Sequence, residues 1–174
     1  MVRFDPDDIS TYPDWAMPSS PAEALALIEA GEDPNKKDSV LENTPLIKAC
    51  IDVNEFSMKV VEILVDNGAD INLCNKYGVS PLHELVSHHS PGHPGLKEQL
   101  AQAELLLKKG ANPNTFSEIY QNTPLHYAVF MNAKEMVSLL LKYGADQTVE
   151  NAKGQTPKKL AMQEGFDQIT NMLG

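Results

Sequence analysis

Three histidines lie within six residues of one another: His88, His89 and His93. Because imidazole nitrogen is a common zinc ligand, the cluster suggests a metal-binding or metal-dependent role. No cysteine or acidic residue lies at a supporting spacing, however, and Pro91 and Pro94 are typical of a polar surface loop. We therefore favour a surface loop and keep a metal site as the alternative.

Other chemistry has less support. The sequence has no phosphate-binding glycine loop, no His-Glu-x-x-His motif and no Gly-x-Ser-x-Gly nucleophile elbow. Its two cysteines, Cys50 and Cys74, fit neither a disulfide framework nor a metal-knuckle spacing. The sequence predicts a protein that is not an enzyme and that needs no cofactor.

A repeated landmark divides most of the chain into units. A Thr-Pro or Ser-Pro pair recurs at intervals of 36, 43 and 33 residues, and a glycine followed by alanine closes each of the first three units. The pairs begin at Thr44, Ser80, Thr123 and Thr156, and the glycines are Gly68, Gly110 and Gly144. A hydroxyl caps a helix start, proline suits the first helical position, and glycine suits a helix end. Each unit is therefore predicted to hold two helices, followed by a turn-rich segment.

These landmarks resemble the ankyrin repeat, whose Thr-Pro-Leu-His-x-Ala signature opens a unit of about 33 residues. The best copy is Thr123–Ala128, followed by the landmark Gly144–Asp146. The resemblance covers roughly residues 20–174. It implies an all-α solenoid of stacked helix pairs with hairpin turns, built from about four repeats plus a degenerate N-terminal unit.

The chain is accordingly divided into an acidic N-terminal segment, residues 1–19, and an ankyrin-repeat domain, residues 20–174. The segment carries Phe4, Tyr12 and Trp15. These aromatics either pack over the first helix pair or form a docking segment. Packing is favoured because large apolar side chains are usually buried.

Two units are longer than the best copy, and the extra residues fall between the paired helices, near 54–57 and 88–96. Such insertions often serve binding, although repeats also tolerate neutral loop growth. Both interpretations stay open. Part of the longer insertion is expected to extend the second helix, because Leu96–Leu107 keeps helical spacing.

In the ankyrin family, partners usually meet the concave side, which is built from hairpin tips and exposed residues of each first helix. Carried over position by position, the resemblance implies the partner-binding residues Ile51, Asp52, Tyr77, Val79, His88, Tyr120, Asn122, Phe130 and Met131. Of these, Tyr77, Val79, Tyr120, Phe130 and Met131 would form one apolar patch across the third and fourth units. The alternative is that Phe130 and Met131 turn inward.

Three further expectations come from the repeat pattern. Glu42 and Gln121 stand where a hairpin glycine is expected, in turns that carry one extra residue. The resemblance implies that His83 and His126 brace their turns by hydrogen bonding. Asn72 lies in a pattern similar to that accepted by an asparaginyl hydroxylase, so it is a modification candidate, with a plain hairpin asparagine as the favoured alternative.

The net charge of -10, from 24 acidic and 14 basic residues, favours a partner protein with a basic surface over nucleic acid or membrane. The charge could equally serve solubility. We expect a monomeric protein–protein interaction module, acting as an adaptor, inhibitor or effector. No N-terminal signal peptide is visible, so a cytoplasmic, intracellular location is expected, with a translocated bacterial effector as an alternative.

Overall fold

The computed structural model describes residues 18, 20–51, 57–88 and 95–174, and this part of the chain is helical with no strand. Its nine helices are α1 (Pro21–Glu29), α2 (Pro45–Ile51), α3 (Ser57–Asp66), α4 (Pro81–Ser87), α5 (Leu96–Lys108), α6 (Pro124–Phe130), α7 (Lys134–Lys142), α8 (Pro157–Gln163) and α9 (Asp167–Met172). The predicted all-α solenoid of helix pairs is confirmed. The N-terminal segment, residues 1–19, lies outside the described residues except for Pro18.

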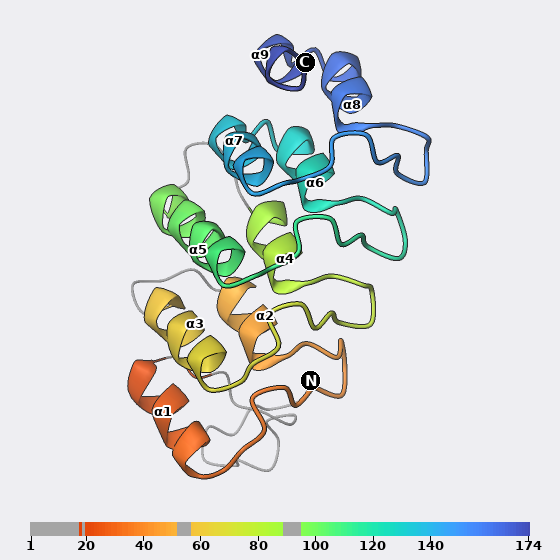
Figure 1. Cartoon of the computed structure of the whole chain (residues 1–174). Coiled ribbons are helices and arrows are strands. Elements are labelled where there is room, and N and C mark those ends of the chain that lie inside the picture. Colours follow the sequence, from red (N-terminus) through yellow and green to blue (C-terminus); the bar gives the residue numbers. More distant parts are fainter. Residues whose placement is uncertain (1–17, 19, 52–56, 89–94) are drawn as a thin grey trace, which may run out of the picture.

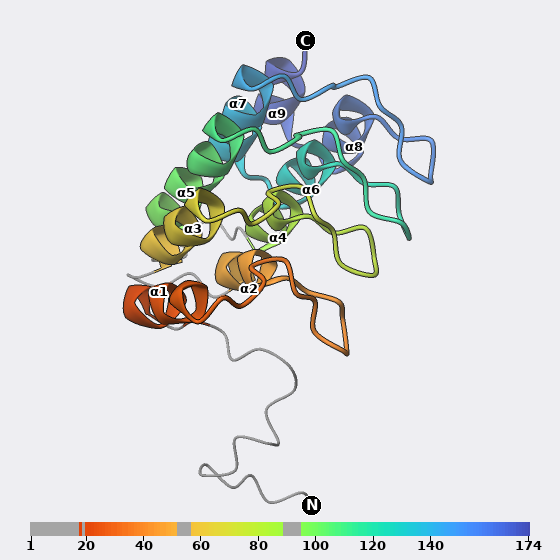
Figure 2. The ribbon, with the colours of Figure 1, turned by 60° about the horizontal axis from the view of Figure 1, so that its bottom comes forward.

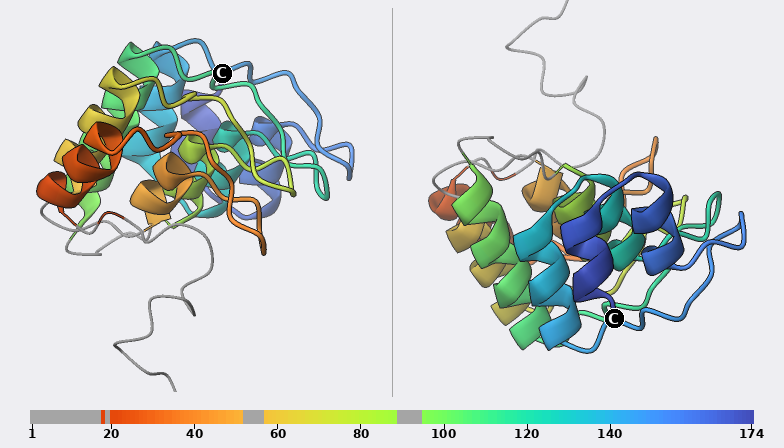
Figure 3. Two further views of the ribbon diagram at one scale, coloured as in Figure 1. Left: turned by 90° about the horizontal axis from the view of Figure 1, so that it is seen from below. Right: turned by 90° about the horizontal axis from the view of Figure 1, so that it is seen from above.

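The helices stack in two layers (Figure 1). The inner layer runs α2, α4, α6, α8, with each helix packed on the next, and the outer layer runs α1, α3, α5, α7, α9. Hairpins connect each outer helix to the next inner helix and project from the same side of the stack, as Figure 2 shows. Seen along the stack in Figure 3, the two layers and the row of hairpins stay in register.

The inner helices begin where the Thr-Pro and Ser-Pro pairs predict. The Ser80 and Thr123 hydroxyls accept hydrogen bonds from the third backbone N–H of α4 and α6. The Nδ1 atoms of His83 and His126 accept a hydrogen bond from the backbone N–H of the capping residue, so each start is a complete capping box. The two predicted histidine braces are thus present.

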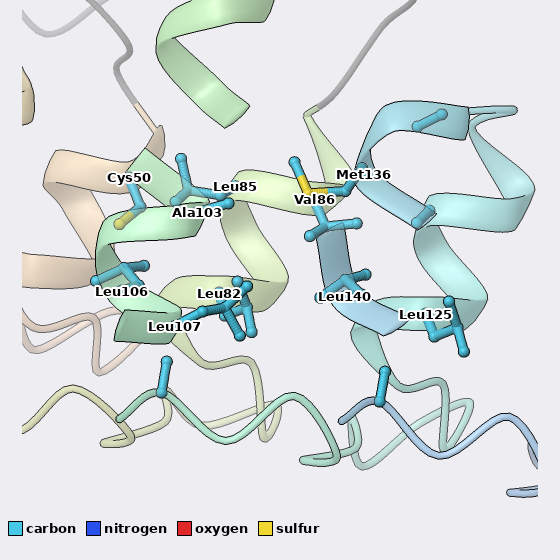
Figure 4. Close-up of a cluster of buried hydrophobic side chains, with 14 of the residues drawn as sticks. Cys50, Leu82, Leu85, Val86, Ala103, Leu106, Leu107, Leu125, Met136 and Leu140 are labelled. Carbon is cyan, nitrogen blue, oxygen red and sulfur yellow. The ribbon is translucent and has the colours of Figure 1, made fainter. Parts of the chain in front are cut away.

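Apolar side chains from both layers fill the space between neighbouring repeats (Figure 4). Leu82 and Leu125 of the inner layer and Leu106 and Leu140 of the outer layer are almost completely buried. Cys50 lies in the same core as a free thiol, and burial raises its pKa well above the usual range. The thiol therefore packs as a small apolar group and not as a nucleophile.

Both insertions join paired helices, as expected: one lies between α2 and α3, the other between α4 and α5. Helix α5 begins at Leu96 and has 13 residues, whereas α3 has 10 and α7 has 9. The sequence therefore correctly predicted that part of the second insertion is helical. The rest of each insertion, residues 52–56 and 89–94, lies outside the described residues.

Two hairpins carry one extra residue. The Asn75 N–H closes its hairpin on the carbonyl of Val79, whereas the Ser117 N–H closes on Asn122, one residue further along. Gln121 takes the place of a hairpin glycine and adopts φ 51°, where the equivalent Gly78 has φ 70°. A side chain in this left-handed region costs about 1–2 kcal/mol.

We expect Gln121→Gly to raise the free energy of unfolding by about 0.5–1 kcal/mol, because relief of the left-handed strain outweighs the added freedom of the unfolded chain. Gln147→Gly is the matched control, since Gln147 is exposed and its φ is not positive. The control should lose stability by about 0.5–1 kcal/mol. Urea titration followed by circular dichroism measures both. Equal losses in the two variants would show that Gln121 is unstrained.

Candidate partner-binding face

The hairpin tips form a continuous row. The backbone N–H groups of Lys76, Glu118 and Ala152 donate to carbonyls of the preceding hairpin, at 3.1, 2.9 and 2.9 Å. These hydrogen bonds hold the tips in a fixed register across four repeats. We use the term concave face for the hairpin tips together with the side of the inner helices that adjoins the hairpins.

Tyr77 and Tyr120 project from this row and are 41% and 56% exposed. Val40 and Ile119, at 60% and 61%, are exposed beside them, each in a hairpin with one extra residue. The sequence analysis missed both residues, because it assigned no binding residue to the turn before Thr44 and only Tyr120 and Asn122 to the turn before Thr123. The extra residue in each turn was the signal that could have identified them.

The first-helix positions separate into exposed and inward side chains. Phe130 is 61% exposed and Ile51 38% exposed. Met131 is partly buried and packs against the core, so the inward alternative holds for Met131 and not for Phe130. Asp52, the remaining position of this group, lies outside the described residues.

A hollow of about 400 Å³ opens on the concave face between α6, α8 and the two hairpins that precede them. It brings together three of the predicted residues: Tyr120, Asn122 and Phe130. The hollow does not include the predicted residues Ile51, Tyr77, Val79, His88 and Met131. The other lining residues are Tyr127, Asn151, Lys153, Gln155, Leu160 and Glu164.

Tyr127 and Leu160 both occupy the fourth position of an inner helix. The equivalent residue of α4 is Glu84, whose side chain is 14% exposed. The Nδ1 atom of His88 lies 3.3 Å from a Glu84 carboxylate oxygen and 2.9 Å from the Glu84 carbonyl oxygen. Burial raises the pKa of Glu84, and the adjacent His88 opposes that rise. Glu84 was missed as a site residue, although its fourth-position place in the repeat could have identified it.

The capping histidines also link neighbouring repeats. The Nε2 of His83 lies 3.2 Å from the Asn122 carbonyl, and that of His126 lies 2.9 Å from the Gln155 carbonyl. In each ring Nδ1 accepts a backbone N–H, so Nε2 carries the proton. Burial lowers the pKa of His83 to about 4 and also lowers that of His126. Neutral rings at these positions therefore support the face on which Asn122 lies.

Asn72, the modification candidate, also joins two repeats. Its amide nitrogen donates to the Gly110 carbonyl at 3.3 Å, and its amide oxygen accepts the Asn112 N–H at 2.8 Å. Asn35 and Asn114 make the same pair of contacts in their own hairpins. Asn72 is thus a framework asparagine, and its modification stays a prediction.

The histidine cluster can be followed only in part. His88 lies at the end of α4 with its Nδ1 engaged by Glu84, and His89 and His93 lie outside the described residues. Within residues 20–51, 57–88 and 95–174, no three His, Cys, Asp or Glu side chains gather as a metal site. In the same part of the chain, no helix is both long and apolar enough to cross a membrane.

Comparisons with known proteins agree with this architecture. A family model described as ankyrin repeats in three copies matches residues 20–117 and 96–174. A fowlpox virus (strain NVSL) protein described as an ankyrin repeat protein is 32% identical over 65% of the chain, and an Escherichia coli (strain K12) protein so described, YahD, is 30% identical over 85%. The human palmitoyltransferase ZDHHC13 is 33% identical over 59% of the chain. The aligned regions span 17% of the viral protein, 70% of YahD and 15% of the palmitoyltransferase.

Proposed function

The chain belongs to the ankyrin-repeat family, and we propose that it is a protein-binding module that holds a partner protein against its concave face. The observation that carries the proposal is the hollow between α6 and α8, because exposed aromatic side chains line it. Aromatic residues at the centre of a contact surface supply much of the binding energy in protein interfaces. In this proposal the protein acts by binding and not by catalysis.

The partner in this proposal has a basic surface. The chain carries a net charge of -10, which attracts a cationic protein and accelerates its association. The protein would act as a monomeric adaptor, inhibitor or translocated effector inside a cell. The free thiols of Cys50 and Cys74 suit a reducing compartment.

Phe130→Ala tests this function. Capture from a native lysate identifies a partner, and titration of the purified partner against both proteins measures affinity. We expect the variant to weaken binding by about 2 kcal/mol, roughly thirtyfold, as truncation of an interface anchor does. Its free energy of unfolding should be nearly unchanged, because the side chain is 61% exposed.

Leu25→Ala is the control, since it removes an exposed apolar side chain from α1 in the outer layer. It should leave affinity unchanged. A partner that binds wild type and Phe130→Ala equally well would contradict the concave face as the binding surface. If affinity depended instead on His89 and His93, the insertion between α4 and α5 would be the site.

A further inference from the structure

The fourth residues of the inner helices form a row along the concave face: Lys48, Glu84, Tyr127 and Leu160. The last two line the hollow between α6 and α8. Lys48 is already paired, because its Nζ lies 3.2 Å from a carboxylate oxygen of Asp38. Glu84 therefore stands as an acidic group between a neutralised lysine and an aromatic hollow.

Within the described part of the chain, the Glu84 carboxylate has no lysine or arginine partner. Among described residues, only the His88 ring lies within 4 Å as a cationic partner, and its Nδ1 is nearer the Glu84 carbonyl oxygen. Glu104 in the outer layer differs, because Lys108 and Lys142 lie 3.4 and 3.2 Å from its carboxylate. A carboxylate that is largely removed from water is stabilised most by an ammonium or guanidinium group. An arginine or lysine from a partner would supply that group at Glu84.

The adjoining hollow favours a different side chain. Tyr120, Tyr127, Phe130 and Leu160 give it mostly apolar walls, and its volume is enough for one large apolar residue. Lys153 and Glu164 also line it, with opposite charges. The hollow therefore selects for apolar size and does not select a charge.

We propose that the concave face binds an extended segment of the partner in which an arginine or lysine, paired with Glu84, lies about four positions from a large apolar residue seated in the hollow. Packed helices lie about 8–10 Å apart, and Glu84 is one and a half helix spacings from the hollow, or about 12–15 Å. An extended chain covers about 3.3 Å per residue, which gives the spacing of about four. The inference rests on the proposed function and specifies its partner.

Selection from a phage-displayed library of random twelve-residue peptides on the intact protein tests the pattern. We expect recovered peptides to share a cationic and a large apolar residue three to five positions apart. Fluorescence anisotropy with the best peptide then measures affinity. Replacing its arginine by citrulline, which keeps the shape without the charge, should weaken binding about tenfold.

Glu84→Gln should weaken binding of the arginine peptide by the same factor. This variant should bind the arginine and citrulline peptides with equal affinity. Glu135→Gln, an exposed residue of α7, is the matched control and should bind as wild type does. The hollow is tested in the same way. Replacing the large apolar residue of the peptide by alanine should reduce its affinity for Tyr120→Ala by a smaller factor than its affinity for wild type. Unfolding midpoints of all variants confirm that they fold.

Recovery of no peptide, of peptides without this spacing, or of peptides indifferent to Glu84→Gln would overturn the inference. In those cases, a folded partner protein that binds wild type but not Phe130→Ala would still support the proposed function. If no peptide with this pattern were recovered and Phe130→Ala also left partner binding unchanged, the concave face would not be the binding surface.

Discussion

Leu125→Ala should lower the free energy of unfolding by about 2–5 kcal/mol, because it leaves a cavity at the centre of the array. Leu125 is completely buried on α6, which packs against both α4 and α8. In a stack of repeats each unit is stabilised mainly by its neighbours, so a defect in a middle unit weakens two interfaces. Urea unfolding followed by circular dichroism measures the loss.

Met162→Ala is the control for this prediction, since it shortens a side chain that is 62% exposed on α8. Its effect should stay within about 0.5 kcal/mol, as is usual for surface substitutions. A loss below about 0.5 kcal/mol for Leu125→Ala as well would mean that α6 does not contribute to the core as described.

The sequence predicted the fold well because each structural signal is local. The proline after Thr123 begins α6, the Gly144 landmark follows α7, and the spacing of Leu96–Leu107 predicts the long α5. Strain could also be read locally, because Gln121 stands where the repeat needs a left-handed residue. A repeated unit shows the same signals several times, so one weak copy is corrected by the others.

The candidate site was harder to predict because it depends on packing between units. The hollow joins Tyr120 of one hairpin to Leu160 and Glu164 of the next repeat, which lie 40 and 44 positions further along the chain. Phe130 and Met131 are neighbours in the sequence, yet they differ in burial because successive helical residues point about 100° apart. Only the three-dimensional stack decides which of the two faces solvent.

Acid should weaken the protein through His83. Its ring is buried, its Nδ1 accepts the Ser80 N–H and its Nε2–H donates to the next repeat, so the fold requires the neutral form. Burial lowers the pKa of His83 to about 4, whereas an unfolded histidine titrates near pH 6.5. The unfolded chain therefore binds more protons between these values, and stability falls as the pH falls from about 6.5 to 4.

The expected loss from this ring is about 2 kcal/mol between pH 7 and pH 5, reaching about 3 kcal/mol near pH 4. His126 adds to the loss in the same direction, because burial lowers its pKa too. Glu84 acts in the opposite direction, because its raised pKa makes protonation favour the folded state. The contribution of His83 must therefore be isolated by comparison with a variant.

The variant His83→Gln isolates the contribution of His83 to the pH dependence of stability. Glutamine lacks a titrating group in this range, so the variant should be less stable at pH 7 but should lose about 2 kcal/mol less than wild type between pH 7 and pH 5. Urea titrations at the two pH values give the four free energies needed. If wild type and variant lost the same amount, His83 would titrate as an exposed ring, and its link to Asn122 would not hold in solution. A smaller loss in the variant would show that the neutral imidazole between two repeats makes the stack sensitive to acid.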